Sequence, residues 1–339
     1  MAEEEKSRQE KVKEITEQLH EGIKQLFQSD KYKDYLRTMS KFTNYSFNNT
    51  VLIAIQRPEA QAVAGYQAWQ TKFDRHVKKG SKAIAIIEPT IWKKQKQEII
   101  VDDKGNPMRD EDGNIIKQKS EERLTGFKVG HVFAYEDTEG KELPSIVNLL
   151  NKDVEGYDGL MDVIKTISPV PIHFETIGSA ANGYFNLETR DIHVESSLPE
   201  LQKVKTTIHE MAHSLLHDKI SGEDPDANNY EREVCAESVA FTVCSYLGLD
   251  TSDYSFGYVG GWSSGKELKE LQEKMEIIRK TANTIIDKIE TEVLTRNEKA
   301  TQAEVLQAAT LQPAQIGNTA ITMEMPMPAV RPQTHRHRR

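Results

Sequence analysis

The pentapeptide His209-Glu210-Met211-Ala212-His213 is the feature that most restricts how this chain can fold. Two histidines four residues apart share one face of an α-helix, close enough for both imidazoles to bind one metal ion. No proline or glycine interrupts residues 200–208, which precede the pentapeptide. The sequence therefore predicts a helix that carries a zinc site, with Glu210 free to act on a water molecule.

A catalytic zinc ion needs a third protein ligand and an open position for water. Glu233 and Glu237 lie four residues apart in a second expected helix, residues 230–241, which follows the polar loop 221–229. One carboxylate can bind zinc while the other holds the outer ring nitrogen of a histidine ligand. We expect Glu233 to be the ligand and Glu237 to support a histidine, and the reverse assignment stays open.

His217 leaves another alternative open, because it follows His213 by four residues on nearly the same face. It could replace a glutamate as the third ligand, or it could close the helix, where the helix dipole favours a histidine. The pentapeptide could also lie on an ordinary amphipathic helix without any metal. The two glutamates on the following helix favour the metal site over that simpler interpretation.

The two segments with the candidate zinc ligands resemble two groups of metallopeptidases. Residues 209–217 resemble the ImmA/IrrE group of zinc metallopeptidases, and residues 233–237 resemble the Glu-x-x-Ala-Asp/Glu ligand helix of gluzincin-like peptidases. The chain is still more similar to the antirestriction ArdC family, whose members join such a peptidase domain to an N-terminal single-stranded-DNA-binding domain. Three further stretches carry this similarity: residues 44–58, 69–80 and 126–133.

The resemblance implies an α+β fold in three parts. A mixed helix and sheet domain that binds single-stranded DNA is expected at residues 1–140. A zincin-like metallopeptidase domain of the gluzincin type is expected at residues 150–295, and a disordered tail at residues 296–339. The similarity covers most of residues 30–290 and weakens in the charged stretch 93–122.

Composition agrees with a two-domain cytoplasmic protein. With 339 residues, 37% hydrophobic and 29% charged, the chain can bury two cores. No apolar stretch approaches the roughly 20 residues of a membrane span, and the acidic start is unlike a signal peptide. Cys235 and Cys244 are nine residues apart on one expected helix, too far to bridge, so we expect both to be reduced core residues.

Charge is unevenly distributed along the chain. Residues 31–96 hold 13 Lys or Arg and 4 Asp or Glu, a balance of +9, whereas the whole chain has a net charge of -9. Aromatic residues are interleaved with these cations, as single-strand binding requires, although a solvated surface over a core would show the same pattern. The resemblance favours single-stranded DNA, and the expected contact residues are Trp69, Lys72, Arg75, Lys78, Lys79 and Lys82.

Periodicity places the remaining elements. Apolar residues at helical spacing predict helices at residues 10–27, 35–42 and 46–56, and β-rich runs predict strands at residues 83–89, 128–135, 172–175 and 191–194. A final helix is expected to start at Ser264, capped with Glu267. Its apolar stripe runs barely three heptads, which favours packing along the peptidase domain over a dimeric coiled coil. From Thr301 the pattern ends, which predicts a disordered tail.

The function that follows is peptide hydrolysis at zinc bound by His209, His213 and Glu233, with Glu210 as general base. Tyr184 and Tyr230 are candidates for stabilising the oxyanion. The resemblance implies a role in antirestriction or in the establishment of conjugatively transferred DNA, with an unidentified protein or peptide substrate and no membrane partner. Two alternatives stay open: a protective DNA-binding protein whose zinc site is not proteolytic, and a repressor-cleaving peptidase whose N-terminal domain recognises protein.

Overall fold

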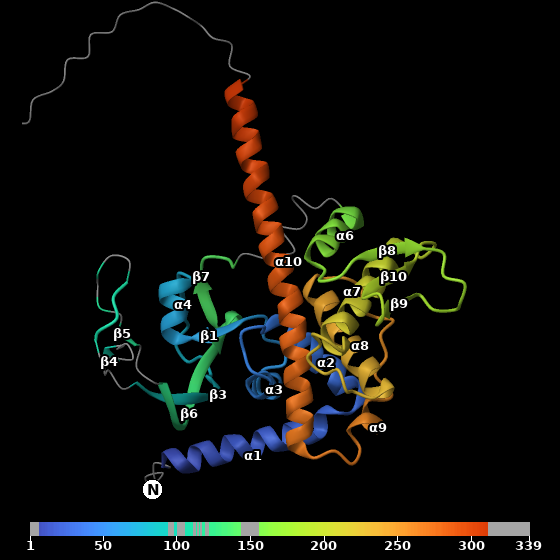
Figure 1. The fold of residues 1–339 in the computed structure, drawn as a ribbon. Coiled ribbons are helices and arrows are strands. Elements are labelled where there is room, and N and C mark those ends of the chain that lie inside the picture. Colours follow the sequence, from blue (N-terminus) through green and yellow to red (C-terminus); the bar gives the residue numbers. More distant parts are fainter. Residues whose placement is uncertain are drawn as a thin grey trace, which may run out of the picture. The chain divides into compact units, whose positions relative to one another are not determined.

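The computed structural model describes residues 7–93, 98–99, 106–110, 113, 115, 117–118, 122–143 and 156–310. The chain divides into two compact units, residues 1–296 and residues 297–339. Helices and strands both build the first unit, so the expected α+β class is confirmed (Figure 1). None of the described helices is both long enough and apolar enough to cross a membrane.

Three helices open the described chain: α1 (Arg8–Leu26), α2 (Ser29–Lys41) and α3 (Phe47–Gln56). Ser7 and Glu10 form a capping box at the start of α1, and the Ser46 hydroxyl accepts a hydrogen bond from the Asn49 amide at the start of α3. All three helices lie where periodicity predicts them. The second begins six residues earlier than expected.

An antiparallel sheet of order β1-β6-β3 follows, built from Val63–Gly65, Glu122–Ala134 and Ile84–Lys93. Helix α3 covers the edge strand β3 with two amide side chains. Asn49 exchanges two hydrogen bonds with the backbone of Ile87, and Gln56 exchanges two with the backbone of Ala85. These side chains take the place of a neighbouring strand, which leaves fewer unpaired groups on that edge.

Smaller elements complete the N-terminal part. Helix α4 (Tyr66–Lys72) leads into β2 (Arg75–Val77), which pairs antiparallel with β7 (Thr138–Gly140) after the short helix η1 (Tyr135–Asp137). Two-residue strands β4 (Glu98–Ile99) and β5 (Lys117–Gln118) pair with each other.

Helix α6 (Gly156–Ile167) precedes a second sheet of order β8-β10-β9. Strand β10 (Asp191–Glu195) pairs parallel with β8 (Ile172–Glu175) and antiparallel with the edge strand β9 (Gly183–Asn186). The two strands predicted from sequence are therefore confirmed. One face of β10 is buried, with Ile192 and Val194 fully covered.

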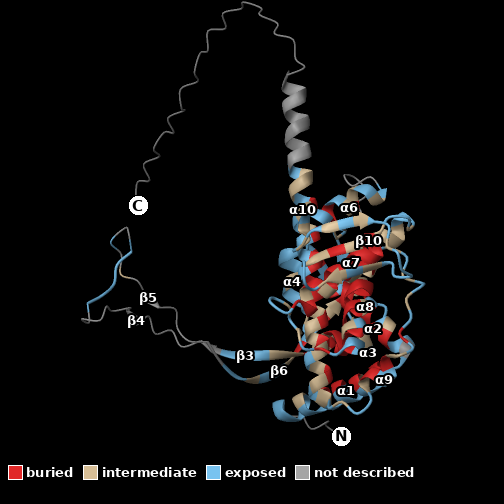
Figure 2. Cartoon of the chain, turned by 45° about the vertical axis from the view of Figure 1, so that its right-hand side comes forward, coloured by how far each residue is buried: buried red, intermediate tan, exposed pale blue. Residues whose placement is uncertain are grey.

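Two long helices follow: α7 (Glu200–His217) packs on this sheet, and α8 (Asn229–Tyr246) packs on α7. Figure 2 shows that buried residues concentrate on α7 and α8. Cys235 and Cys244 lie buried in α8 as free thiols, as predicted. Burial raises the pKa of each thiol to about 12.

The C-terminal helices correct two expectations. Ser264 is the C-cap of the short helix α9 (Val259–Ser263), so it does not begin the last helix. That helix, α10, spans Leu268–Thr310 and thus extends into the stretch expected to be a disordered tail. The loss of apolar periodicity at Thr301 does not end the helix, because helix-forming residues continue to Thr310. The remainder of the predicted tail lies outside the described residues.

Most buried apolar residues of the first unit belong to one core. Helices α1, α2 and α3 contribute Ile23, Tyr35 and Leu52 to the same cluster in which α7 and α8 place Ile208 and Phe241. A smaller cluster lies between α3 and the sheet β1-β6-β3. The N-terminal helices are therefore packed into the core that supports α7 and α8.

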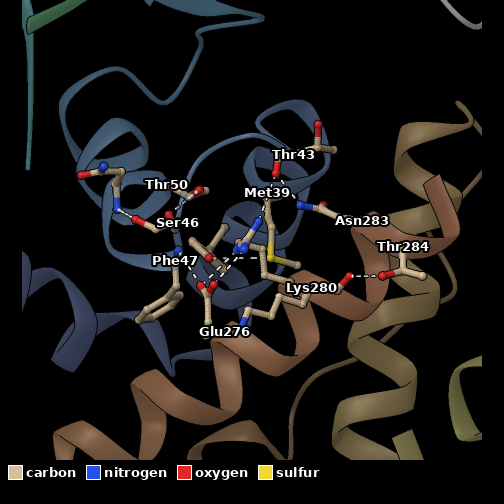
Figure 3. Close-up of polar contacts among 12 residues, drawn as sticks. Met39, Thr43, Ser46, Phe47, Thr50, Glu276, Lys280, Asn283 and Thr284 are labelled. Atoms are coloured by element: carbon tan, nitrogen blue, oxygen red, sulfur yellow. Dashed lines mark hydrogen bonds and ion pairs between the residues drawn. The ribbon is translucent and has the colours of Figure 1, made fainter. Parts of the chain in front are cut away.

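Helix α10 contacts the segment that joins α2 to α3. The carboxylate of Glu276 accepts a hydrogen bond from the Phe47 amide, and Arg279 and Asn283 both donate to the Thr43 carbonyl oxygen. Figure 3 shows Glu276 and Asn283 directed at this segment. Glu276 therefore binds the positive N-terminus of α3, where a carboxylate is favoured.

Candidate metal centre and nucleic-acid surface

His209 and His213 lie one turn apart on α7, as the pentapeptide predicts. Their Nε2 atoms are 3.1 Å apart, and both rings are largely shielded from solvent. The helix runs unbroken from Glu200 to His217, so the two histidines lie well inside it. Their facing nitrogens define one side of a candidate metal site.

Helix α8 brings Glu233 to the same place. Its Oε2 lies 3.5 Å from Nε2 of His209, and its Oε1 lies 3.6 Å from Nε2 of His213. Asn228 caps the start of α8 by accepting a hydrogen bond from the Glu231 amide, and Glu233 is the fifth residue of this helix. These three residues offer donor atoms that all lie within 4.8 Å of one another.

The donor separations fit a small divalent metal. Ligands at about 2.0–2.1 Å in tetrahedral geometry lie about 3.3–3.4 Å apart. The observed separations of 3.1, 3.5 and 3.6 Å are close to that edge length. Two imidazoles and one carboxylate are also the donor set of many catalytic zinc sites. The residues present therefore suit the predicted metal.

Glu237 lies one turn after Glu233 and contacts the other nitrogen of His209. Its Oε2 is 3.2 Å from Nδ1 of His209. The same face of α8 thus presents one carboxylate to the inner nitrogen of His209 and another to the outer nitrogen. This geometry favours the expected assignment, in which Glu233 is the ligand and Glu237 orients a ligand.

Charge interactions in the metal-free site favour a protonated His209. Burial acts to lower its pKa, but the hydrogen bonds that its ring donates to Glu233 and Glu237 outweigh burial and raise the pKa to about 10. The same hydrogen bonds, from His209 and His213, lower the pKa of Glu233 far below its ordinary value. A metal ion that bound both histidines would have to displace this proton from His209.

Glu210 lies beside the edge strand β9. Its side chain is buried, which raises its pKa, and the Phe185 amide donates a hydrogen bond to its carboxylate. A Cβ at Gly183 would lie 2.7 Å from the Thr206 methyl group and 3.3 Å from Cγ of Glu210. Glycine is therefore required at position 183 for β9 to pass this close to α7.

A cavity of about 600 Å³ opens over these residues. It is lined by both histidines, Glu210, Glu233 and Glu237, and by β9. Tyr184 lines the cavity as well, stacked on His193 at 4.7 Å, whereas the Tyr230 hydroxyl donates to the Tyr258 carbonyl oxygen. Of the two oxyanion candidates, Tyr184 is thus the one that contributes to the cavity wall.

Two cationic side chains of the cavity were missed in the sequence. Lys205 is buried and forms an ion pair with Asp253, with 2.6 Å between Nζ and Oδ1. Arg232 donates to the carbonyl oxygens of Ala227 and Pro225. Lys205 precedes His209 by four residues, so its helical spacing was a usable signal.

Among the residues expected to bind DNA, Trp69 is corrected by the structure. Its side chain is only 1% exposed, and its Nε1 donates to the Phe133 carbonyl oxygen at 2.9 Å. The ring lies between α4 and the strand β6, so it cannot stack on a base. Alternation of aromatic and basic residues did not distinguish a core tryptophan from an exposed one.

Arg75 is corrected in the same way. It is 5% exposed, and its guanidinium donates to Thr138, to the Gly140 carbonyl oxygen and to the Lys141 carbonyl oxygen. It also stacks on the Tyr135 ring, 4.1 Å from the centroid. Arg75 joins β2 to β7 and is not available to a phosphate.

The other expected contacts are exposed. Lys72 ends α4, and the remaining lysines follow β2 in the turn before β3: Lys78, Lys79 and Lys82. Lys78 also donates to the Glu136 carbonyl oxygen. Two aromatic residues near them are exposed, Tyr66 at 58% and Phe73 at 37%. Residues 66–82 therefore present exposed lysines and exposed rings, although not the tryptophan expected.

Comparison with known proteins relates both parts of the chain to described families. The family model for the N-terminal domain of anti-restriction factor ArdC matches residues 5–133, and the model for an IrrE N-terminal-like domain matches residues 168–245. The second match contains all the metal-site residues on α7 and α8.

Two crystal structures and one curated protein also match. The metal-free and Mn(II)-bound structures of the antirestriction ArdC protein from plasmid R388 are 17% and 19% identical to this chain. Each match covers 74% of this chain. The metal-free structure is matched over 86% of its chain with a TM-score of 0.42, and the Mn(II)-bound structure over 85% with a TM-score of 0.39. An uncharacterized Bacillus anthracis protein is 25% identical over 322 residues, 84% of this chain and 52% of that protein.

The chain therefore spans about half the length of the curated relative that it matches. Its two family matches follow one another without overlap. Taken together, the two family matches support an ArdC-like protein, in which a segment that matches the ArdC N-terminal domain is followed by one that matches an IrrE N-terminal-like domain.

Proposed function

We propose that this chain is a zinc-dependent metallopeptidase that also binds single-stranded DNA. The observation that carries the enzymatic part is the grouping of His209, His213 and Glu233, with donor atoms 3.1–3.6 Å apart, in a cavity that Glu210 also lines. A metal site that opens into a cavity is typical of catalysis, because a structural zinc site is closed by a fourth protein ligand.

The side chains divide the chemistry among them. A bound zinc ion would supply Lewis acidity and a water molecule of lowered pKa. Glu210 accepts a proton from the attacking water and passes it to the leaving amine. Burial raises the pKa of Glu210, which brings this carboxylate closer to the pH at which it can both accept and release a proton. Glu237 keeps the His209 ring in place.

The DNA-binding part rests on the exposed lysines Lys72, Lys78, Lys79 and Lys82 and on the match to the ArdC N-terminal domain. Phosphate contacts from lysines give affinity without sequence preference, which suits incoming single strands of any sequence. The biological role proposed is antirestriction or establishment of conjugatively transferred DNA in the cytoplasm of a recipient cell.

The test is a comparison of Glu210→Gln with wild type. The amide keeps the shape of Glu210 but removes its basicity, so zinc content and retardation of single-stranded DNA should both be retained. Hydrolysis of an unfolded protein substrate should fall at least about 100-fold, the usual effect of losing a general base. Glu188→Gln, at an exposed position, is the matched control and should behave as wild type.

A survival assay for incoming unmodified DNA then separates the candidate functions. Loss of protection in Glu210→Gln supports the peptidase. Full protection by Glu210→Gln, together with loss of protection when the exposed lysines are replaced, replaces the proposal with a DNA-binding protein whose metal site is not proteolytic. If the lysine variants protect and Glu210→Gln does not, the repressor-cleaving peptidase is the function that remains.

A further inference from the structure

His217 contacts the metal centre from behind. Its Nδ1 lies 3.0 Å from Nδ1 of His213, and its side chain is 1% exposed. Histidines that bind a metal through one ring nitrogen usually donate a hydrogen bond from the other, which fixes the ring and its tautomer. For His209 this partner is Glu237. We propose that His217 is the corresponding positioning residue for His213, accepting a hydrogen bond from its Nδ1.

The contact geometry determines both tautomers. His213 needs the lone pair of Nε2 for the metal, so its proton lies on Nδ1. A hydrogen bond between two Nδ1 atoms needs one donor and one acceptor, so His217 accepts at Nδ1 and carries its own proton on Nε2. That Nε2 is buried and has no hydrogen-bond partner among the described residues. Among the described residues, the His217 ring therefore makes its hydrogen bond to His213 through Nδ1.

Neither of the earlier alternatives fits this arrangement. A third ligand would have to reach the metal, yet His217 meets His213 at the nitrogen directed away from Glu233. A residue that stabilises the helix end by its charge would need solvent or a carboxylate, because burying an unpaired charge is very unfavourable. The geometry therefore indicates a neutral imidazole that acts on another imidazole.

The end of α7 keeps His217 in position. Asp218, the C-cap, accepts hydrogen bonds from Arg190 and Ser221, both at Oδ2. The following turn packs closely, since a Cβ at Gly222 would lie 2.5 Å from the Leu216 carbonyl oxygen. These contacts fix the end of the helix from which His217 projects, and its side chain is buried, as a positioning role requires.

The two histidine ligands consequently differ in their support. His209 is held by a carboxylate and His213 by a neutral ring. A carboxylate partner makes an imidazole a stronger donor to a metal than a neutral partner does. This inference rests on the proposed metal site, because a positioning residue has no role without a bound metal.

The experiment uses three substitutions in the full chain. His217→Asn places an amide oxygen near the position of Nδ1, His217→Gln places one near Nε2, and His217→Leu removes both. Zinc dissociation constants are measured by competition with a chromogenic chelator, and the cobalt-substituted proteins are compared by their visible absorption spectra. Thermal unfolding of each metal-free protein checks that it folds.

We expect His217→Leu and His217→Gln to bind zinc about 10- to 100-fold more weakly than wild type, with an altered cobalt spectrum. His217→Asn should recover most of the affinity and the wild-type spectrum, because it restores an acceptor at the right place. Equal affinity in folded His217→Leu overturns the proposal, and so does a folded His217→Asn that binds no better than His217→Leu.

One measurement needs no substitution. Nitrogen-15 chemical shifts of the histidine rings in the zinc-loaded wild type should show a proton on Nδ1 of His213 and on Nε2 of His217. The opposite tautomer of His217 overturns the proposal even if a variant fails to fold. If wild type binds no zinc at all, the proposed metal site itself is wrong, which is a result distinct from a normal metal site insensitive to His217.

Discussion

The hydroxyls of Tyr32 and Ser238 lie 2.8 Å apart in the buried contact between α2 and α8, although 206 residues separate them. Ser238 follows Glu237 in the chain, and its hydroxyl donates to the Val234 carbonyl oxygen, so Tyr32 is the donor of the pair. The N-terminal helix α2 therefore lies directly against the helix that carries the metal-site carboxylates. The two parts of the chain are coupled through their core.

A fragment of residues 156–296 should for this reason fail to fold alone. Removing α1, α2 and α3 exposes the face of α8 on which Tyr32 and the rest of α2 pack, and the lost burial exceeds the margin by which domains are stable. Thermal unfolding followed by circular dichroism should show no cooperative transition. A cooperative transition, with zinc bound at the same stoichiometry as in the full chain, would contradict this prediction.

Replacement of the two α8 carboxylates should have unequal effects on zinc. Glu233→Ala removes one of three ligands and should abolish most binding at micromolar zinc. Glu237→Ala leaves the ligands in place and should weaken binding only about 10- to 100-fold. Zinc content after dialysis and dissociation constants measure both. The opposite ranking would exchange the roles of the two residues.

Zinc binding should release about one proton per ion from His209 at pH 8. Its pKa in the metal-free folded protein, about 10, lies above the ordinary value of 6.5, so the ring is charged throughout this interval. The affinity for zinc should rise about tenfold per pH unit from pH 7 to 9. In the metal-free protein the charged ring stabilises the fold fully below pH 6.5, and this contribution is lost as the pH rises through 10.

Calorimetry in buffers of different ionisation enthalpy gives the number of protons released. Glu237→Gln is the matched variant, because it removes one of the hydrogen bonds that raise the pKa of His209. It should release fewer protons at pH 8 than wild type does. Identical release by both proteins, or none by wild type, would show that His209 is already neutral before the metal binds.

Trp69→Ala should act on stability and not selectively on DNA binding. The side chain is fully buried, so its loss should lower the free energy of unfolding by about 3–5 kcal/mol. Phe73→Ala, at a ring that is 37% exposed, is the control and should cost much less. Denaturant titration measures both. A Trp69→Ala protein of unchanged stability that no longer binds DNA would return this ring to the binding surface.

Charge removal at Lys78, Lys79 and Lys82 should weaken single-strand binding for every sequence. If all three contact phosphates, the slope of log affinity against log salt should become shallower by about 2, because each contact accounts for about 0.7. Fluorescence anisotropy at several salt concentrations measures the slope. The control replaces three other exposed lysines: Lys219, Lys269 and Lys288. Equal effects in both triple variants would indicate only a change in net charge.

The grouping of side chains at the candidate metal centre was predictable because its geometry is local. His209 and His213 are brought together by one helix, and Glu233 and Glu237 by another, so residue spacing places each pair without knowledge of the fold. The same reasoning predicted the strands that flank this site. Which carboxylate meets which nitrogen depends on how α7 packs on α8, and spacing alone left that open.

The incorrect predictions of DNA-contacting residues share a different cause. Trp69 and Arg75 look like nucleic-acid contacts in sequence, but their partners, Phe133 and Thr138, follow more than 60 residues later. Local sequence patterns do not predict the burial of a side chain when that burial depends on contacts with residues far away in the sequence. His217 was ambiguous for a related reason, since its contact with His213 depends on ring rotation and on the turn that covers the end of α7.

Glu276 is translated 229 residues after Phe47, whose amide it binds through α10. At roughly 5–20 residues per second, α3 leaves the ribosome roughly 10 to 50 s before this partner exists. During that time the apolar faces of the first three helices are not covered by α8 and α10. The nascent chain should therefore require a chaperone, and the metal centre should mature only after synthesis has passed α10.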